Sequence, residues 1–160
     1  NLETINCTIL VDEIPESGIS AMFRGCSSLK TVPVIKSTKL GKDACNATFA
    51  YCHELPIVPE LNIETVSEKS CLGMFLDCYS ITESPVLKAS QLQTSCYNQM
   101  FSGCKNLTKI TCLATENISS GATNWVSGVP SNGTFIKHPN STWSTGVNGI
   151  PAGWTVEEYK

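Results

Sequence analysis

The stretch MFRGCSSLKTVPVI, from Met22 to Ile35, is followed along the chain by three related stretches. They are TFAYCHELPIVPEL from Thr48, MFLDCYSITESPVL from Met74 and MFSGCKNLTKITCL from Met100. The same spacing of 26 residues separates the members of two series, Phe23, Phe49, Phe75 and Phe101, and Cys26, Cys52, Cys78 and Cys104. A fixed period of roughly 20 to 50 residues is typical of solenoids and repeat arrays. The sequence therefore predicts a stack of similar turns.

One half of each period has the pattern of a short strand. Apolar residues recur at three fixed places, with Ser84 as the one exception: Leu29, Leu55, Ile81 and Leu107; Val32, Val58, Ser84 and Ile110; Ile35, Leu61, Leu87 and Leu113. A proline stands at one place in three of the four copies, at Pro33, Pro59 and Pro85. Because proline has no backbone N–H to donate, we expect the strands to be short and interrupted.

The other half of each period, around 40–49, 66–75 and 92–101, has the pattern of a helix. Leu92, Cys96 and Met100 follow one another at i, i+4 and i+8, which places them on one helical face. Thr65 and Glu68 have the spacing of a capping box at a helix start. The predicted repeat is thus a strand followed by a helix, 26 residues long.

A single strand-helix unit cannot bury its apolar stripe alone, so the copies are expected to stack into a curved α/β solenoid. We assign residues 1–113 to this solenoid, as a partial first repeat and four repeats. The chain begins inside a repeat, since Leu2, Ile5 and Cys7 match later residues of the pattern, which are Leu107, Ile110 and Cys112.

Residues 114–160 are predicted to form a small β-rich capping subdomain. Turn dipeptides in VPSNGTFI and GVNGIPAGWTV suggest two hairpins. Large aromatic residues of this segment would close the last repeat, and these are Trp125, Phe135, Trp143 and Trp154.

The charge of the chain argues against a nucleic-acid partner, and its hydropathy argues against a membrane-spanning segment. Lys and Arg total 11 against 14 Asp and Glu, for a net charge of −3, so the chain has no basic surface for nucleic acid. Apolar runs are all shorter than the roughly 18 residues of a membrane-spanning helix, so no transmembrane segment is expected in this chain.

The nine cysteines form an odd number, so they cannot all pair within the chain. Neighbouring turns would lie close enough for disulfides, but stacked side chains point in parallel rather than toward each other. We therefore expect mostly free, buried thiols that act as small apolar residues. With no C-x-x-C pair, and with His53 and His138 as the only histidines, neither a zinc site nor any other cofactor is expected.

Candidate catalytic groups are few. His53 directly follows Cys52, but neighbouring residues of a tight turn rarely face each other, and a solvated histidine explains it as well. Asp12, Glu13 and Glu16 are explained by a charged, solvated edge. We therefore expect no enzymatic activity.

Two kinds of binding surface are considered. The first is the outer face of the strands, where a repeat protein can recognise another protein through the candidate residues Lys30, Thr31, Ile57, Glu83 and Lys109. The alternative is glycan binding by the aromatic rings of the tail, Trp125, Trp143, Trp154 and Tyr159. Packing of these rings in the core of the cap is the simpler explanation for them.

The run FRGCSSLKTV, together with TFAYCHEL and MFSGCKNLTKI, resembles the BspA-like leucine-rich repeats of bacterial surface proteins. The ending GTFIKHPNSTWSTGVNGIPAGWTVEEYK is similar to the variant common in surface proteins of gut Bacteroidetes. The resemblance implies a leucine-rich-repeat solenoid that is secreted or attached to the cell surface, binds or adheres to a protein partner, and is not an enzyme. The 26-residue period is longer than is usual in that family, and Ser84 departs from its apolar pattern.

Overall fold

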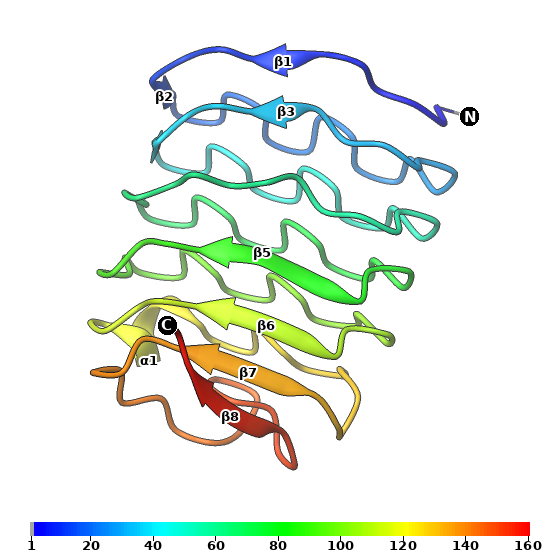
Figure 1. Ribbon diagram of the computed structural model, residues 1–160. Helices are drawn as coiled ribbons and strands as arrows, with labels where there is room; N and C mark the ends of the chain where they lie inside the picture. The colour runs from blue at the N-terminus through cyan, green and yellow to red at the C-terminus, as the bar shows by residue number, and fades with distance from the viewer. Residues whose placement is uncertain (1) are drawn as a thin grey trace.

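The computed structural model describes residues 2–160, which wind into a parallel β-solenoid of about six turns (Figure 1). Strand-bearing segments lie one above another across one side of the stack, and turn-rich segments run behind them. The elements are β1 (Thr8–Ile9), β2 (Glu13–Ile14), β3 (Val34–Ile35), β4 (Lys39–Leu40), β5 (Glu83–Leu87), β6 (Lys109–Cys112), α1 (Ile118–Gly121), β7 (Thr134–Lys137) and β8 (Thr155–Glu158). No helix of residues 2–160 is long and apolar enough to cross a membrane.

All the strands pair in parallel with the equivalent segment of the next turn. Thr8 pairs with Val34 and Glu13 with Lys39, so the register follows the 26-residue period of the sequence. The four strands β5, β6, β7 and β8 form the largest sheet, in that order. The predicted solenoid and its short strands are confirmed.

Ser84, which breaks the apolar pattern, has a structural role at an irregularity of this sheet. The register between β5 and β6 shifts between Glu83 and Val86, at Pro85. The backbone N–H of Thr111 donates to the Ser84 hydroxyl over 3.0 Å. A polar side chain thus supplies an acceptor to the neighbouring strand at the place where the register shifts.

The predicted helices are wrong, and with them the α/β strand-helix repeat. The segments around 40–49, 66–75 and 92–101 are runs of overlapping β-turns. The N–H groups of Asn46 and Thr48 donate three residues back, to Asp43 and Cys45, over 3.1 and 3.3 Å. Those of Cys45 and Ala47 donate to carbonyls of the next turn of the solenoid, over 2.7 and 2.8 Å. The four-residue α1 is the only helix in the described residues.

The turn-rich segments have the same sequence pattern as a helix because their backbone conformation repeats every four residues. A left-handed φ recurs at Asp43 (52°), Ala47 (51°) and Tyr51 (64°), and the same places repeat in the turns before and after. Side chains at i, i+4 and i+8 therefore share one face, as they nearly do at 3.6 residues per helical turn. Leu92, Cys96 and Met100 are all buried, as a helical face would be, but the backbone that carries Cys96 and Met100 is a run of β-turns.

The core consists of side chains that stack from turn to turn. The rings of Phe23, Phe49, Phe75 and Phe101 lie 5.5, 5.7 and 5.7 Å apart and nearly parallel. The last three are fully buried, whereas Phe23 in the first of these turns is half-buried. The four phenylalanines thus lie one above another, which agrees with the stack of similar turns predicted from their spacing.

All nine cysteines are free, and seven of them are buried. Three of the repeated thiols bond to the phenylalanine carbonyl of the preceding turn: Cys52 donates to Phe23 over 3.2 Å, Cys78 to Phe49 over 3.0 Å and Cys104 to Phe75 over 3.1 Å. Cysteine suits this place because it is small and apolar and still carries a weak donor. Burial raises the pKa of the Cys104 thiol to about 12.

Residues 114–160 continue the stack instead of forming the two predicted hairpins. β7 pairs in parallel with both β6 and β8, and Lys109 lies opposite Thr134. The last strand follows after a shorter connection, because Thr134 pairs with Thr155. The boundary at residue 113 thus falls just after β6, within a continuous sheet.

Aromatic residues of this tail pack on the last repeat. Trp125 lies 6.0 Å from the ring of Phe101 and takes the place of a further phenylalanine in the stack. Trp143 stacks on Trp125 at 5.0 Å, and Phe135 meets both rings edge-on. The indole N–H groups of Trp125 and Trp154 donate to the carbonyls of Gly149 and Pro130, over 2.8 and 2.7 Å.

Candidate functional site

Four of the five residues predicted to bind a partner occupy one column of the strand-bearing side, one in each turn: Thr31, Ile57, Glu83 and Lys109. Lys109 Nζ lies 3.2 Å from Glu83 Oε2, so these two side chains form an ion pair with each other. Ile57 is 54% exposed and is the one apolar residue of the column. The structure therefore leaves Ile57 as the free apolar contact of this set.

Thr31 bonds to the preceding turn, whereas Lys30 forms only a surface ion pair. The hydroxyl of Thr31 accepts from the Ile5 N–H over 2.7 Å and donates to the Ile5 carbonyl over 3.2 Å. Lys30 Nζ lies 3.9 Å from Glu3 Oε2, and both side chains are largely exposed. Surface pairs of this kind contribute little to stability, so Lys30 remains available to a partner whereas Thr31 does not.

A chain of three adjoining hollows follows the strand-bearing side from turn to turn. The first, of about 310 Å³, and the second, of about 140 Å³, share Val32 and Val34. The second and the third, of about 380 Å³, share Val58, Pro59 and Glu60. We call this chain of hollows the sheet-face groove, defined by Val32, Val34, Val58, Val86 and Tyr159.

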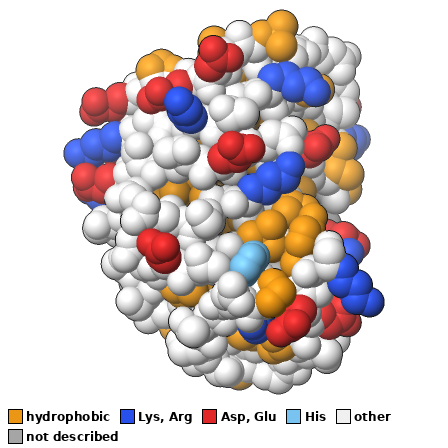
Figure 2. Space-filling view, turned by 60° about the vertical axis from the view of Figure 1, so that its left-hand side comes forward, with side chains coloured by type: hydrophobic (Ala, Val, Ile, Leu, Met, Phe, Trp, Pro, Cys, Tyr) orange, Lys and Arg blue, Asp and Glu red, His pale blue; other side chains and the backbone are white. Residues whose placement is uncertain are grey.

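The groove combines an apolar lining with charged edges. Val34 is 48% exposed and Tyr159 44% exposed, and buried prolines lie between the valines. Lys36, Glu60 and Lys88 stand along the groove, and Lys88 Nζ donates to Asn62 Oδ1 over 2.6 Å. Figure 2 shows hydrophobic side chains gathered on one side of the lower half of the molecule, with charged side chains around them.

The sequence pattern missed most of this groove. It placed Val32 and Val58 among the core residues, but both are only half-buried and face the hollows. Tyr159 was grouped with the tryptophans of the tail, although it lies against β5 and the turn before it. The signal present in the sequence is a valine beside each of these prolines, as in Val32-Pro33-Val34, Val58-Pro59 and Pro85-Val86.

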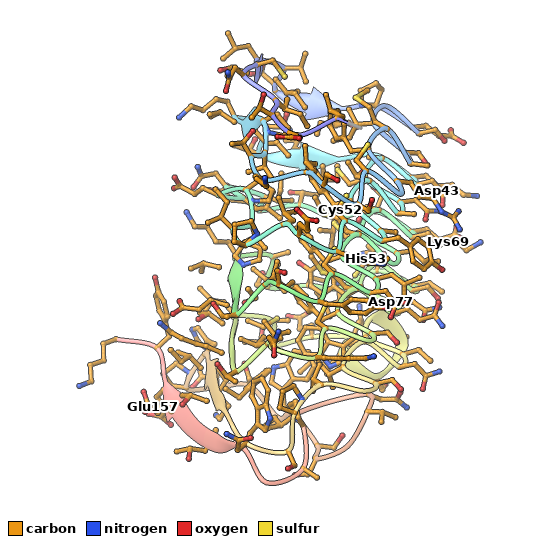
Figure 3. All side chains as sticks on the ribbon, turned by 90° about the vertical axis from the view of Figure 1, so that its right-hand side faces the viewer. Asp43, Cys52, His53, Lys69, Asp77 and Glu157 are labelled. Carbon is orange, nitrogen blue, oxygen red and sulfur yellow. The ribbon has the colours of Figure 1, made fainter. Side chains whose placement is uncertain are left out.

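The neighbouring Cys52 and His53 do not form a nucleophile-base pair (Figure 3). The Cys52 thiol points inward to the Phe23 carbonyl, whereas the His53 ring stacks on Tyr79 at 4.6 Å. Burial, and then the nearby Cys26, raise the pKa of the Cys52 thiol to about 12, which disfavours the reactive thiolate. This pair therefore lacks the contact and the ionisation that nucleophilic catalysis requires.

Metal-ligating side chains do not converge anywhere in residues 2–160, where no group of three His, Cys, Asp or Glu is close enough to share an ion. Asp12, Glu13 and Glu16 are all exposed, as a solvated edge would be. Figure 3 shows Asp43, Lys69 and Asp77 on the turn-rich side and Glu157 at the opposite corner of the molecule.

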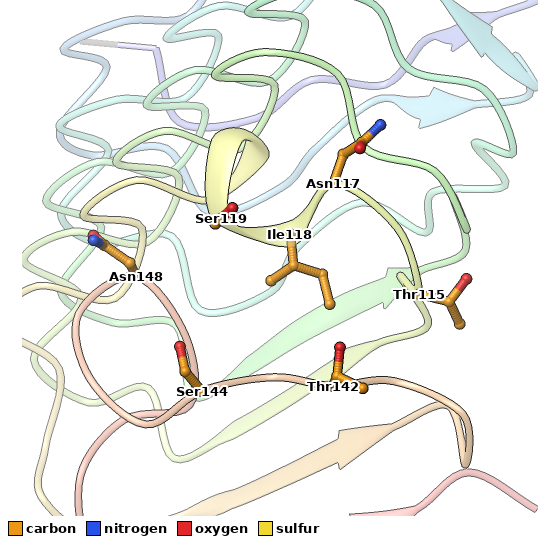
Figure 4. Close-up of a pocket in the computed structure, with 7 residues that line it drawn as sticks. All are labelled: Thr115, Asn117, Ile118, Ser119, Thr142, Ser144 and Asn148. Atoms are coloured by element: carbon orange, nitrogen blue, oxygen red, sulfur yellow. The ribbon is translucent and has the colours of Figure 1, made fainter.

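Another hollow, of about 490 Å³ and separate from the sheet-face groove, lies between α1 and the segment 142–148 (Figure 4). Its lining is uncharged: Thr115, Asn117, Ile118, Ser119, Thr142, Ser144 and Asn148. Figure 4 shows the Ile118 side chain pointing into the middle, with the hydroxyls of Thr142 and Ser144 facing it from the opposite segment. We call this hollow the tail cleft.

Comparison with known proteins gave no assignment, because no protein-family model, curated protein sequence or solved structure matched the chain.

Proposed function

We propose that the protein is a non-enzymatic binding module that holds a segment of another protein in the sheet-face groove. The observation that carries this proposal is the continuity of the three hollows along successive turns, with an apolar lining that solvent reaches. An exposed apolar surface with charged edges is typical of protein interaction sites.

The groove suits a partner segment that carries aliphatic or aromatic side chains flanked by both charge signs. Such side chains would cover Val34, Val58 and Val86 and exclude water from them. Tyr159 would supply a large aromatic ring, a residue type that often dominates binding energy. Lys36, Glu60 and Lys88 would orient the segment through opposite charges at the rim. Ile57, from the column, and Lys30, which precedes the column residue Thr31, would extend the contact.

The resemblance to BspA-like repeats favours a role in adhesion, with the protein secreted or displayed at a cell surface. The fold is compatible with that role because the parallel stack gives a rigid, preformed surface that loses little entropy on binding. Glycan recognition by the tail aromatics is the alternative. Burial of Trp125 and Trp154 in the core weighs against that arrangement.

Selection from a library of displayed random peptides on the immobilised 160-residue chain tests the proposal. Enriched peptides should share apolar residues, and Val34→Asp or Tyr159→Ala should weaken their binding by about tenfold or more. Thr94→Asp is the matched control, because Thr94 is exposed and lies in the turn-rich part of its repeat. Peptides that bind all the variants equally, or no enrichment at all, would contradict the proposal.

A further inference from the structure

We propose that the tail cleft is a binding site for a neutral saccharide of one or two sugar units. The site is separate from the sheet-face groove, and no residue lines both. Its volume of about 490 Å³ falls in the range of roughly 300 to 1,000 Å³ that is usual for small-molecule sites.

The uncharged lining of the cleft restricts the class of ligand. No lysine, arginine, histidine, aspartate or glutamate lines it, so a phosphate, a carboxylate or a metal cation would find no opposite charge there. Ile118 is the only apolar side chain, which is too little surface for a lipid or a hydrophobic peptide. A neutral polar ligand fits this lining best.

Three hydroxyls of the cleft are free to bond with a ligand. Ser119, Thr142 and Ser144 line the cleft with side chains that are exposed to solvent, so their hydroxyls are accessible to a ligand. A hydroxyl both donates and accepts, and so does every hydroxyl of a sugar, so the two sets are complementary in either direction.

Ile118 adds the apolar contact that a sugar ring needs. In Figure 4 its side chain reaches into the space between α1 and the opposite segment, across from Thr142 and Ser144. A pyranose ring has a face of C–H groups and a rim of hydroxyls. With that face on Ile118, its rim would meet the hydroxyls of the opposite wall.

The wall that carries Thr142 and Ser144 is fixed before any ligand binds. The Ser141 hydroxyl donates to the Ala114 carbonyl over 2.6 Å, and Asn148 Oδ1 accepts from the Asn124 N–H over 2.6 Å. Gly149 packs so tightly on the Ser144 carbonyl that no side chain would fit at this position. A preformed wall lowers the entropic cost of binding a small ligand.

Titration of the full 160-residue chain with glucose, galactose, N-acetylglucosamine and maltose tests the proposal, with amide NMR shifts as the readout. At least one of these sugars should shift the amides of Ile118, Ser119, Thr142 and Ser144 in a saturable way. Glucuronate, which adds a carboxylate to the same ring, should bind no more tightly than glucose.

The double variant Thr142→Val/Ser144→Ala should weaken sugar binding by about tenfold, because it removes two hydroxyls and keeps the bulk of both side chains. Thr82→Val/Ser90→Ala is the matched control and should leave the affinity unchanged, since both residues are exposed and lie outside the cleft. The proposal is overturned if none of the four sugars binds at tens of millimolar, if the shifts map elsewhere, or if the two double variants bind alike.

Discussion

Residues 15–113 and residues 114–160 extend the same stack with different side chains. In the first region each turn repeats a phenylalanine and a cysteine, and the rings lie 5.5 to 5.7 Å apart with little tilt. In the second region Trp125 tilts by 57° against Phe101, and Trp143 and Phe135 close around it. The backbone nevertheless continues its pairing, as the N–H of Phe101 donates to the Trp125 carbonyl over 2.8 Å.

The difference shows that backbone pairing and side-chain repetition are separable in a solenoid. Equal side chains can stack only on an equal turn, and residues 114–160 do not repeat the phenylalanine and cysteine pattern of the earlier turns. A cluster of differently oriented aromatic rings fills the space that a regular stack would leave open, because rings also attract one another edge to face. Residues 138–160 can thus depart from the repeat and still contribute to the core of the stack.

Deletion of residues 114–160 should have the largest effect, because it uncovers a whole layer of the core. Met100, Phe101, Ile110 and Cys112, all fully buried, would face solvent beside the open edge of β6. We expect an aggregated or partly unfolded product by size-exclusion chromatography and circular dichroism. A soluble, monomeric and cooperatively folded fragment 1–113 would show that the tail is not needed to close the stack.

Alkaline pH should destabilise the repeats strongly, since the buried thiols belong to that region. Burial raises the pKa of Cys45, Cys104 and Cys112 from 9.0 to about 12. The unfolded chain would therefore lose these protons first, and stability would be intact below pH 9 and fall between pH 9 and 12. Each such thiol should lower the free energy of unfolding by about 1.4 kcal/mol per pH unit in that window.

Urea denaturation from pH 8 to 11 measures this dependence. A variant with Cys45→Ala and Cys104→Ala is the control, and its pH slope should be smaller although its stability at pH 8 is lower. At pH 8 a thiol reagent should label only the exposed Cys7 and the half-buried Cys26 in the folded protein. Equal labelling of all nine cysteines, or a flat pH profile, would contradict the buried thiol series.

Phe75→Ala should lower the free energy of unfolding by about 3 to 5 kcal/mol, because the ring is fully buried between two others. Trp125→Ala should cost a similar amount in the tail. Phe23→Ala should cost clearly less, since this ring is half-buried and has one stacked neighbour. Urea denaturation followed by circular dichroism should give one transition for each variant if both regions form one cooperative unit.

The stack could be predicted from the sequence because repetition at a fixed spacing is visible without knowledge of the backbone. Its turn-rich side could not, because burial every fourth residue, as at Leu92, Cys96 and Met100, fits both a helix and overlapping β-turns. The left-handed φ of Tyr51, 64°, distinguishes β-turns from a helix. A tyrosine in the sequence does not indicate such a conformation, whereas a glycine would.

The candidate sites were predictable in part. Counting in steps of 26 predicts that Glu83 lies opposite Lys109, and these two residues do pair between β5 and β6. The sheet-face groove also depends on Tyr159, which no periodicity connects with Val86, and on valines that share the apolar pattern of the core. The tail cleft brings α1 beside residues 142–148, and this arrangement follows from the packing of a region in which the sequence no longer repeats.

The smallest predicted effect concerns Ser84, where the regular pattern is interrupted within the repeats. Ser84→Ala removes the acceptor of the Thr111 N–H and leaves that donor without its partner between two strands. The loss of the acceptor should lower the free energy of unfolding by about 1 to 2 kcal/mol.

Ser90→Ala, an exposed serine of the same turn, is the control for Ser84→Ala and should stay within about 0.5 kcal/mol of the parent. Ser84→Val separates the two explanations of this position. If the place needs only apolar volume, as Val32 and Val58 suggest, valine should stabilise the protein. If the bulge at Pro85 needs the hydroxyl, valine should destabilise it at least as much as alanine does, and amide hydrogen exchange at Thr111 should become faster in both variants.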